Sequence, residues 1–184
     1  MKPRIVVALG LVLAAALSPV SPSNAQILNP IVLENQRPGS ANVLTDLLSR
    51  YNPATIAGYA DTTSVNLGKR ISFKVSTSQP GPYTINVYRL GYYGGSGARL
   101  VASSGVLAGI TQAPCPVTDP ATRLIECQWK TSYPLNIGRS WISGIYMAKL
   151  IHSASQREYP IYFIVRDDKR RSDIVFQSAR NTAL

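Results

Sequence analysis

The sequence predicts an all-β fold, an antiparallel β-sandwich with a short N-terminal arm. Apolar and polar residues alternate with a period of two, so that Ile71, Phe73 and Val75 share one face of a predicted strand, and residues 83–87 repeat the pattern. Turn-forming residues separate such segments, as in the stretch SQPGP between these two strands. Short alternating strands bounded by turn signals are typical of a sandwich.

The same pattern places further strands along the chain. We expect strands at Thr55–Ala60, Arg70–Ser76, Tyr83–Tyr88, Arg99–Ser103, Leu124–Lys130, Gly144–Ile151, Tyr159–Arg166 and Asp173–Gln177. The alternating region has the size of one immunoglobulin-like domain, so we place such a sandwich at residues 54–167. Residues 168–184 would then be a linker and the start of a further domain.

Residues 26–53 are expected to form the N-terminal arm, laid over the sandwich. Helical spacing is confined to Ala41–Tyr51, and Pro53 ends it. In a helix of one or two turns, four apolar residues would share a face: Val43, Leu44, Leu47 and Leu48.

The first 25 residues have the pattern of a signal peptide. Lys2 and Arg4 precede the apolar run Ile5–Leu17, and the small residues Ser23 and Ala25 precede the expected cleavage. The alternative is an uncleaved membrane anchor, but a spanning helix needs about 20 apolar residues. We therefore expect a secreted or periplasmic protein with no membrane span after cleavage.

The two cysteines fit an oxidising compartment. Cys115 and Cys127 are expected to form a disulfide, which by the chain-entropy model stabilises the fold by about 3 kcal/mol. The alternatives are free thiols or half of a zinc site. A zinc site needs four closely spaced ligands, and the chain has one histidine and no CxxC.

The formal net charge is +10, and most basic residues are scattered singly. The exceptions are Lys69-Arg70 and Lys169-Arg170-Arg171. A basic balance can indicate nucleic acid, an anionic surface or an acidic partner. Because an exported protein seldom meets nucleic acid, we expect no nucleic-acid partner.

No catalytic constellation is apparent in the sequence. His152 would be the usual base of a triad, but no GxSxG nucleophile elbow accompanies it. Asp167 and Asp168 are neighbours, which in a strand point to opposite faces, and basic residues follow them. We expect a surface histidine and a charged turn.

The glycine-rich segment Gly91–Arg99 has two interpretations. It lacks GxxxxGK and a complete GxGxxG, so a phosphate cradle is not supported. It can be a hairpin turn whose glycines permit positive φ. Tyrosines beside glycines also suit a protein–protein contact. The candidate interface residues are Tyr92, Tyr93, Gly94, Gly95 and Arg99.

Tyr146 and Trp141 are assigned structural roles. Gly144 stands two residues before Tyr146 at the start of an apolar strand. In immunoglobulin-like sandwiches, a tyrosine so placed forms a corner in which its hydroxyl bonds to backbone upstream. The alternative role for Tyr146 is a ligand contact.

A series of fragments is distinctive in its order along the chain. They are Asn29–Gly39, Ile56–Ala60, Ser64–Gly68, Val87–Gly95 (VYRLGYYGG), Ser143–Tyr146 and Phe163–Asp168. Together they resemble the N-terminal region of the large (beta) subunit of N,N-dimethylformamidase and its exported relatives. The resemblance implies an immunoglobulin-like sandwich that leads into a larger catalytic domain, which in the amidase holds an iron bound by tyrosines and a carboxylate.

The chain ends where the resemblance would place that domain, so we expect a truncated form. No residue of this chain matches the family's metal or catalytic positions. We therefore expect no catalytic residue, no metal ligand and no cofactor in this chain.

Three functions are compatible with the sequence. The first is a non-catalytic, exported accessory or docking domain that contacts a catalytic domain or subunit. The second is a piece of a split or truncated amide hydrolase. The third is a polysaccharide-binding or adhesin-like module, for which tyrosines and basic charge would favour an anionic glycan as partner.

Overall fold

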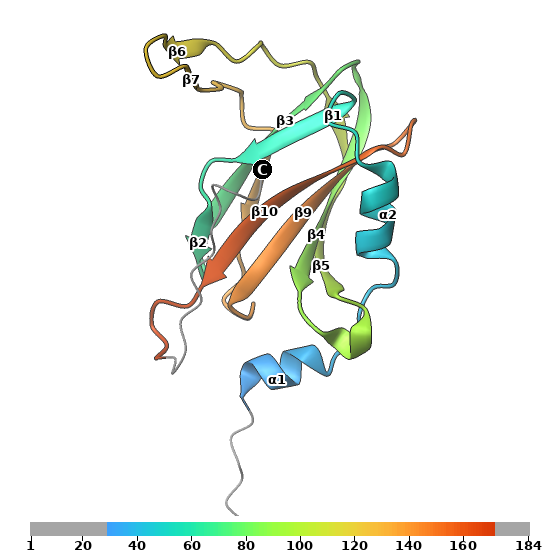
Figure 1. The fold of residues 1–184 in the computed structure, drawn as a ribbon. Helices are drawn as coiled ribbons and strands as arrows, with labels where there is room; N and C mark the ends of the chain where they lie inside the picture. Colours follow the sequence, from blue (N-terminus) through green and yellow to red (C-terminus); the bar gives the residue numbers. More distant parts are fainter. Residues whose placement is uncertain (1–28, 172–184) are drawn as a thin grey trace, which may run out of the picture.

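The computed structural model describes residues 29–171 and confirms the all-β sandwich (Figure 1). The larger sheet consists, in spatial order, of β2 (Ser64–Asn66), β10 (Glu158–Arg166), β9 (Gly144–His152), β4 (Gly81–Leu90) and β5 (Ala98–Gly109). The smaller sheet consists of β1 (Ile56–Ala60), β3 (Arg70–Thr77) and β8 (Tyr133–Asn136). Neighbouring strands are antiparallel except β2 and β10, which are parallel.

The period-two pattern produces the core between the two sheets. Along β3, every second residue is buried, including Ile71, Phe73 and Val75. The inward residues Tyr83, Ile85 and Val87 of β4 are likewise buried, as the alternation predicts. Phe73 of one sheet meets Phe163 of the other edge-to-face, with ring centroids 5.7 Å apart, so aromatic packing joins the layers.

The strand predictions differ from the structure for the shortest strands. The strand expected at Leu124–Lys130 is shorter, because β7 covers only Leu124–Ile125. The short strands β2, β6 (Val117–Asp119) and β8 were not predicted, since three or four residues carry too little alternation to recognise. The expected signal peptide and the strand expected at Asp173–Gln177 lie outside the described residues.

Two helices precede the sandwich, α1 (Pro30–Asn35) and α2 (Val43–Arg50). The second falls within the predicted helix. Its Val43 and Leu47 pack with Tyr88, Ala98 and Met147. Within residues 29–171, no helix has enough apolar length to cross a bilayer.

Only part of the predicted apolar face of α2 is buried. Leu44 is partly exposed and Leu48 is 82% exposed. Of the four apolar residues expected on one face of this helix, only Val43 and Leu47 are therefore buried against the sandwich. Residues one position apart on a helix differ by about 100°, so a narrow contact covers only one of each adjacent pair.

The predicted disulfide between Cys115 and Cys127 is present. It lies at the base of the β6–β7 hairpin, which projects from one end of the sandwich in Figure 1. Tyr59 holds this base, because its hydroxyl donates to the Cys127 carbonyl oxygen over 2.6 Å and accepts from the Trp129 N–H over 3.2 Å.

Tyr146 joins the core to the segment before β9. Its hydroxyl donates to the carbonyl oxygen of Ile142 over 2.6 Å. Its ring stacks on Trp141, with centroids 5.1 Å apart, and tilts against Phe163. This is the geometry of a tyrosine corner, in which one side chain both packs and satisfies a backbone carbonyl.

The Tyr146 hydroxyl should make stability fall at alkaline pH. Burial raises the pKa of Tyr146 far above its usual value of about 10. Because the unfolded chain ionises first, stability is fully present below about pH 10 and is lost as pH rises further. Tyr146→Phe should cost about 1 kcal/mol at pH 7, through the lost hydrogen bond, and make the alkaline loss shallower.

Urea unfolding of the wild-type protein and of Tyr146→Phe between pH 7 and pH 11 measures this effect. Burial also raises the pKa of Tyr83 and Tyr88, so the variant should keep part of the slope. Stability curves that stay parallel across the whole pH range would contradict the prediction.

Candidate functional site

Helix α1 lies against the glycine-rich segment and forms the candidate site with it. The Asn29 side chain caps α1 by accepting from the Ile31 N–H over 3.0 Å, and Pro30 occupies the first turn. A helix of 6 residues is too short to be stable alone. Tertiary contacts must therefore hold it in place.

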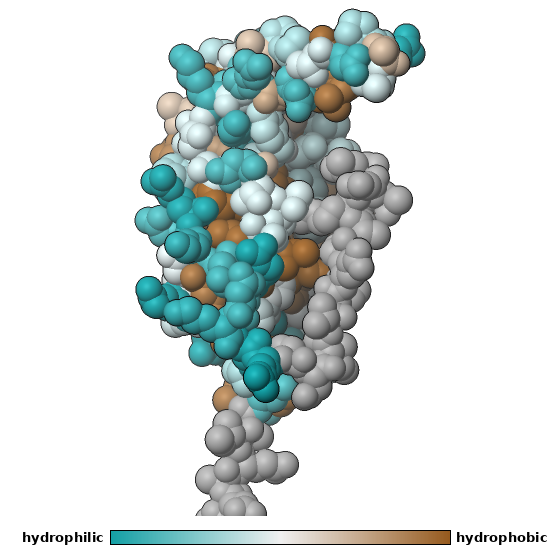
Figure 2. Space-filling view, turned by 90° about the vertical axis from the view of Figure 1, so that its left-hand side faces the viewer, coloured by the Kyte–Doolittle hydropathy of each residue, from teal (hydrophilic) through white to brown (hydrophobic). Residues whose placement is uncertain are grey.

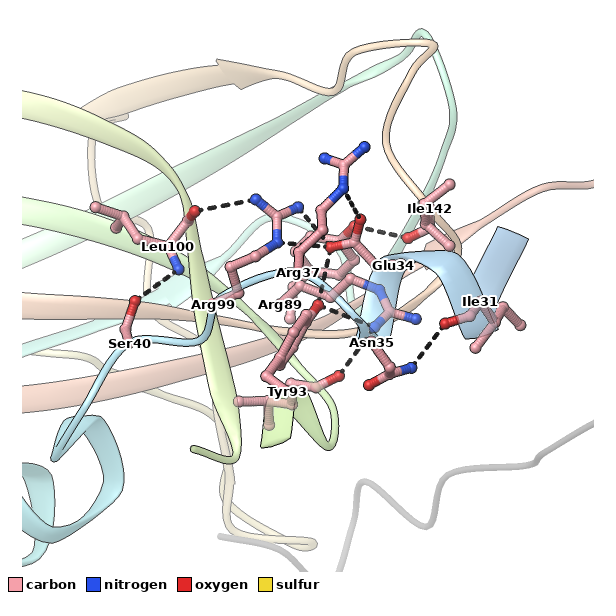
Figure 3. A network of polar contacts seen from close by, with 12 residues as sticks. Ile31, Glu34, Asn35, Arg37, Ser40, Arg89, Tyr93, Arg99, Leu100 and Ile142 are labelled. Atoms are coloured by element: carbon pink, nitrogen blue, oxygen red, sulfur yellow. Dashed lines mark hydrogen bonds and ion pairs between the residues drawn. The ribbon is translucent and has the colours of Figure 1, made fainter. Parts of the chain in front are cut away.

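The main contact is Glu34, which is only 3% exposed (Figure 3). Arg99 of β5 donates to Glu34 Oε1 from Nε over 2.7 Å and from Nη2 over 2.5 Å. Arg37 lies on the solvent side, with its Nε 3.4 Å from Glu34 Oε2. The Tyr93 hydroxyl also donates to Oε1, over 2.9 Å. Glu34 thus joins α1 to β5 and to the glycine-rich segment between β4 and β5.

Arg89 extends this network into the sheet. Its side chain is buried on β4 and donates from Nη1 to the Tyr93 hydroxyl over 3.1 Å and from Nη2 to the Ser143 carbonyl oxygen over 3.0 Å. Tyr93 therefore lies between a buried cation and a buried carboxylate. Burial, against the lowering effect of Arg89, raises the pKa of Tyr93, so the phenol stays protonated and can donate to Glu34.

The backbone of the glycine-rich segment is fitted closely to α1. The Tyr92 N–H donates to Asn35 Oδ1 over 2.7 Å. A Cβ at Gly91 would lie 2.6 Å from the same oxygen, which leaves no room for a side chain. Gly94 has a φ of 64° and begins the sharp reversal that returns the chain to β5. These two glycines are needed for close approach and for the turn.

An apolar groove of about 730 Å³ runs between α1 and the glycine-rich segment. We call it the α1 groove. Its lining includes Ile31, Val32, Pro38, Tyr92 and Gly94. Val32 is 48% exposed and Tyr92 is 73% exposed, so large apolar surface faces solvent beside a network that fixes its walls. Such a surface suits binding better than bond-breaking chemistry.

The predicted interface residues separate into two groups. Tyr92, Gly94 and Gly95 are exposed. Tyr93 is buried, and Arg99 is paired with Glu34. Both side chains therefore hold α1 in place and are not free to contact a partner. The neighbours Tyr92 and Tyr93 thus have different surroundings, although the sequence analysis assigned both to the same exposed interface.

Sequence reasoning missed Glu34, Asn35 and Arg89. A signal for Arg89 existed, because the inward alternation of β4 at Tyr83, Ile85 and Val87 continues to position 89. A charged residue at an inward position requires a buried partner. No comparable signal marked Glu34, whose partner Arg99 is 65 positions away.

Neither of the other polar candidates assembles a reaction centre. His152 Nδ1 lies 2.9 Å from Ser155 Oγ in the β9–β10 turn, and no carboxylate among residues 29–171 is bonded to its ring. Asp168 pairs with Arg166 at 3.1 Å, and Asp167 stands apart from that ion pair. These contacts fit a turn and a charged surface.

The iron chemistry that the resemblance implies does not fit the carboxylate and tyrosine found together here. Glu34 and Tyr93 pair a carboxylate with a phenol, but Arg99, Arg37 and Arg89 supply the surrounding charge. Cations disfavour a metal ion, and a raised phenol pKa opposes the phenolate that iron would need. In the part of the chain that the structure describes, no group of three or more His, Cys, Asp or Glu side chains could hold a metal.

Similarity to solved structures is weak. Alkylpurine DNA glycosylase AlkC from Pseudomonas fluorescens, bound to DNA with an abasic site analogue, has 15% identity and a TM-score of 0.34 over 61% of this chain and 30% of its own. Beta-glucosidase from Listeria innocua has 12% identity and a TM-score of 0.32 in complex with laminaribiose, over 60% of this chain and 16% of its own. The same enzyme with glucose has 13% identity, a TM-score of 0.31 and the same coverage. These TM-scores support no inference about fold or function.

No curated protein matches the chain. Residues 84–183 match the family model described as "N,N-dimethylformamidase beta subunit-like, C-terminal". The match begins in β4 and includes Arg89, Tyr93 and Arg99 of the network. It corrects one expectation, because the model represents the C-terminal and not the N-terminal region of the family. The expected position ahead of the catalytic region therefore loses its support. The chain belongs to the N,N-dimethylformamidase beta subunit-like family.

Proposed function

We propose that this protein is an exported, non-catalytic accessory domain that docks onto a catalytic domain or subunit through the α1 groove. The observation that carries the proposal is exposed apolar surface on a rigid support: Val32 and Tyr92 face solvent, while buried Glu34 ties the helix beneath them to Arg99. Side chains that the fold already holds in their binding positions lose less conformational entropy when a partner binds. The signal-peptide pattern and the disulfide support export.

The shape and composition of the groove support a protein partner. Its lining is mainly apolar, with Asn35, Gln36 and Arg37 along it. An apolar centre with polar groups around it, including an arginine and a tyrosine, is the usual composition of a protein interface. Tyr92 would be the anchor, since its ring is large and its hydroxyl can remain hydrated.

The test is binding to the protein encoded beside this one, measured by light scattering after coexpression and then by titration calorimetry. Tyr92→Ser and Val32→Ser should each weaken the complex, and Tyr92→Ser by about 30-fold or more, as expected for an aromatic anchor. The matched control is Leu48→Ser, which removes an equally exposed apolar side chain from α2 and should leave the affinity within about threefold. An equal loss in all three variants, or no complex with wild type, would reject the proposal.

Membership of the family favours a second candidate, a component of an amide hydrolase. In that case this chain would contribute to activity only in an assembly, since Glu34 and Tyr93 do not fit a metal site. Iron content and hydrolysis of N,N-dimethylformamide are measured for the chain alone, for its partner alone and for the complex. Activity that requires both chains would support this candidate, and activity of the partner that is unchanged by this chain would reject it.

A further inference from the structure

A second concave surface lies where the β2–β3 turn meets the segment after β10. It is a pocket of about 460 Å³ lined by Asn66, Leu67, Gly68, Lys69, Arg139, Asp167 and Lys169. We call it the basic pocket. Its residues come from three separated segments: the β2–β3 turn, the stretch after β8 and the stretch after β10.

Backbone hydrogen bonds fix the walls of this pocket. The Gly68 N–H donates to the Ile137 carbonyl oxygen over 3.0 Å, and the Ile137 N–H donates to the Lys69 carbonyl oxygen over 2.8 Å. Asn66 Oδ1 accepts from the Asp168 N–H over 3.2 Å, which ties the segment after β10 to the β2–β3 turn. The fold therefore holds the backbone of the pocket, and the exposed side chains of Lys69, Arg139 and Lys169 line it.

Gly68 places the Arg139 guanidinium over the pocket. Its φ of +73° favours glycine, and an added Cβ would lie 3.3 Å from Arg139 Cγ and 3.5 Å from Nε. The bare backbone of Gly68 thus lets the Arg139 side chain lie close against the turn. Its planar group can then offer two parallel N–H donors to an oxyanion.

The cations of the pocket have no anionic partners among residues 29–171. Lys69, Arg139 and Lys169 make no ion pair and no side-chain hydrogen bond there, although several other basic residues do. Further basic side chains lie close in sequence to the pocket: Arg70, Arg166, Arg170 and Arg171. Unpaired cations in a concave surface raise the local positive potential, which a bound anion would relieve.

Figure 2 faces the side of the molecule on which β2 lies. Strongly hydrophilic residues gather there toward the end opposite the β6–β7 hairpin. This face contrasts with the α1 groove, whose lining is mainly apolar. The two surfaces therefore suit ligands of different chemistry.

We propose that the basic pocket binds the carboxylate or sulfate groups of an acidic polysaccharide. Single exposed ion pairs contribute little, so one small anion would bind weakly. A polymer with repeated anionic groups can contact the pocket and the neighbouring arginines at the same time. Once one group is bound, the next is held nearby at a high effective concentration, which raises the overall affinity. Asp167 adds a carboxylate acceptor for sugar hydroxyls beside the cations.

The same residues argue for a glycan over nucleic acid. No aromatic side chain lines the pocket, so it offers no platform on which bases could stack. The carboxylate of Asp167 can accept from a sugar hydroxyl, a group that lies beside the anionic groups along an acidic polysaccharide. The proposal is independent of docking at the α1 groove.

The experiment measures binding to heparin and to polygalacturonate at about 150 mM salt, with neutral dextran and a short DNA duplex for comparison. The wild-type protein should bind both acidic glycans and not dextran. Lys69→Glu combined with Lys169→Glu should weaken that binding about tenfold, since lost attractions and new repulsions each contribute a few-fold. Arg139→Gln should weaken it less, and far-ultraviolet circular dichroism should show that both variants are folded.

The matched control is Arg123→Glu combined with Arg157→Glu, which changes the net charge equally at exposed sites away from the pocket. It should bind within about threefold of wild type. An equal loss in both double variants would mean that only net charge matters and would overturn the proposal. Tighter binding to the DNA duplex than to either glycan, or no glycan binding by wild type, would overturn it as well.

Discussion

Glu34→Ala is expected to destabilise the protein by about 3 kcal/mol and to release α1 from the sandwich. The carboxylate is almost completely buried and accepts from Arg99 and Tyr93. Removing it leaves the partly buried Arg99 without its anionic partner, and leaves the Tyr93 hydroxyl, to which the buried Arg89 donates, without its acceptor. Losing one member of a buried ion pair costs about 3–5 kcal/mol, and we take the lower end because Arg99 can turn toward solvent.

Urea unfolding and hydrogen exchange measure this effect. Exchange should accelerate in α1 and at the Tyr92 amide, because a helix this short has no stability of its own. The control is Arg37→Ala, which removes the exposed partner of the same carboxylate and should cost less than about 1 kcal/mol. Equal losses in the two variants would show that the buried network does not hold the helix.

Glu158→Ala is expected to cost about 3–5 kcal/mol through a second buried carboxylate. Glu158 lies at the start of β10 and is 1% exposed, with Oε2 3.0 Å from Lys149 Nζ and Oε1 3.5 Å from Arg50 Nη1. Lys149 is itself buried on β9. The variant would leave its ammonium in the sheet without a counter-charge, and would also separate Arg50 of α2 from the sandwich.

A double variant isolates the charge from the packing. Glu158→Leu combined with Lys149→Met replaces both members by apolar side chains of similar size, and should recover at least half of the loss. Thermal unfolding measures the series, in which Glu158→Ala should lower the midpoint by about 10 °C. A double variant as unstable as Glu158→Ala would show that the ion pair is not the cause.

The strands were predictable because their signal is local. Inward residues such as Phe73 and Ile85 alternate with polar ones, and this pattern needs no knowledge of the partner strand. The disulfide was predictable because the chain has only two cysteines and its signal-peptide pattern led us to expect an oxidising compartment, where they have one possible pairing. The shortest strands and α1 were not predicted, because a few residues carry no measurable period and are held by contacts from elsewhere.

The candidate surfaces depend on contacts between distant segments. Tyr92 and Tyr93 are identical neighbours in the sequence, yet one is exposed and the other lies between Arg89 and Glu34. The family resemblance identified the right family but placed the chain at the wrong end of it. Short motifs record which family a chain belongs to more reliably than they record which region of a longer relative it represents.

The sequence by itself determined the two-layer β fold, the pairing of Cys115 with Cys127 and the family, because each follows from residues close in sequence or from their order. Only the tertiary structure decided that Glu34 meets Arg99, and that Lys69, Arg139 and Lys169 share one pocket. The physical reason is that burial and charge pairing are set by which strands and turns lie side by side. That arrangement depends on the packing of the whole chain, so no pattern within a single segment predicts it.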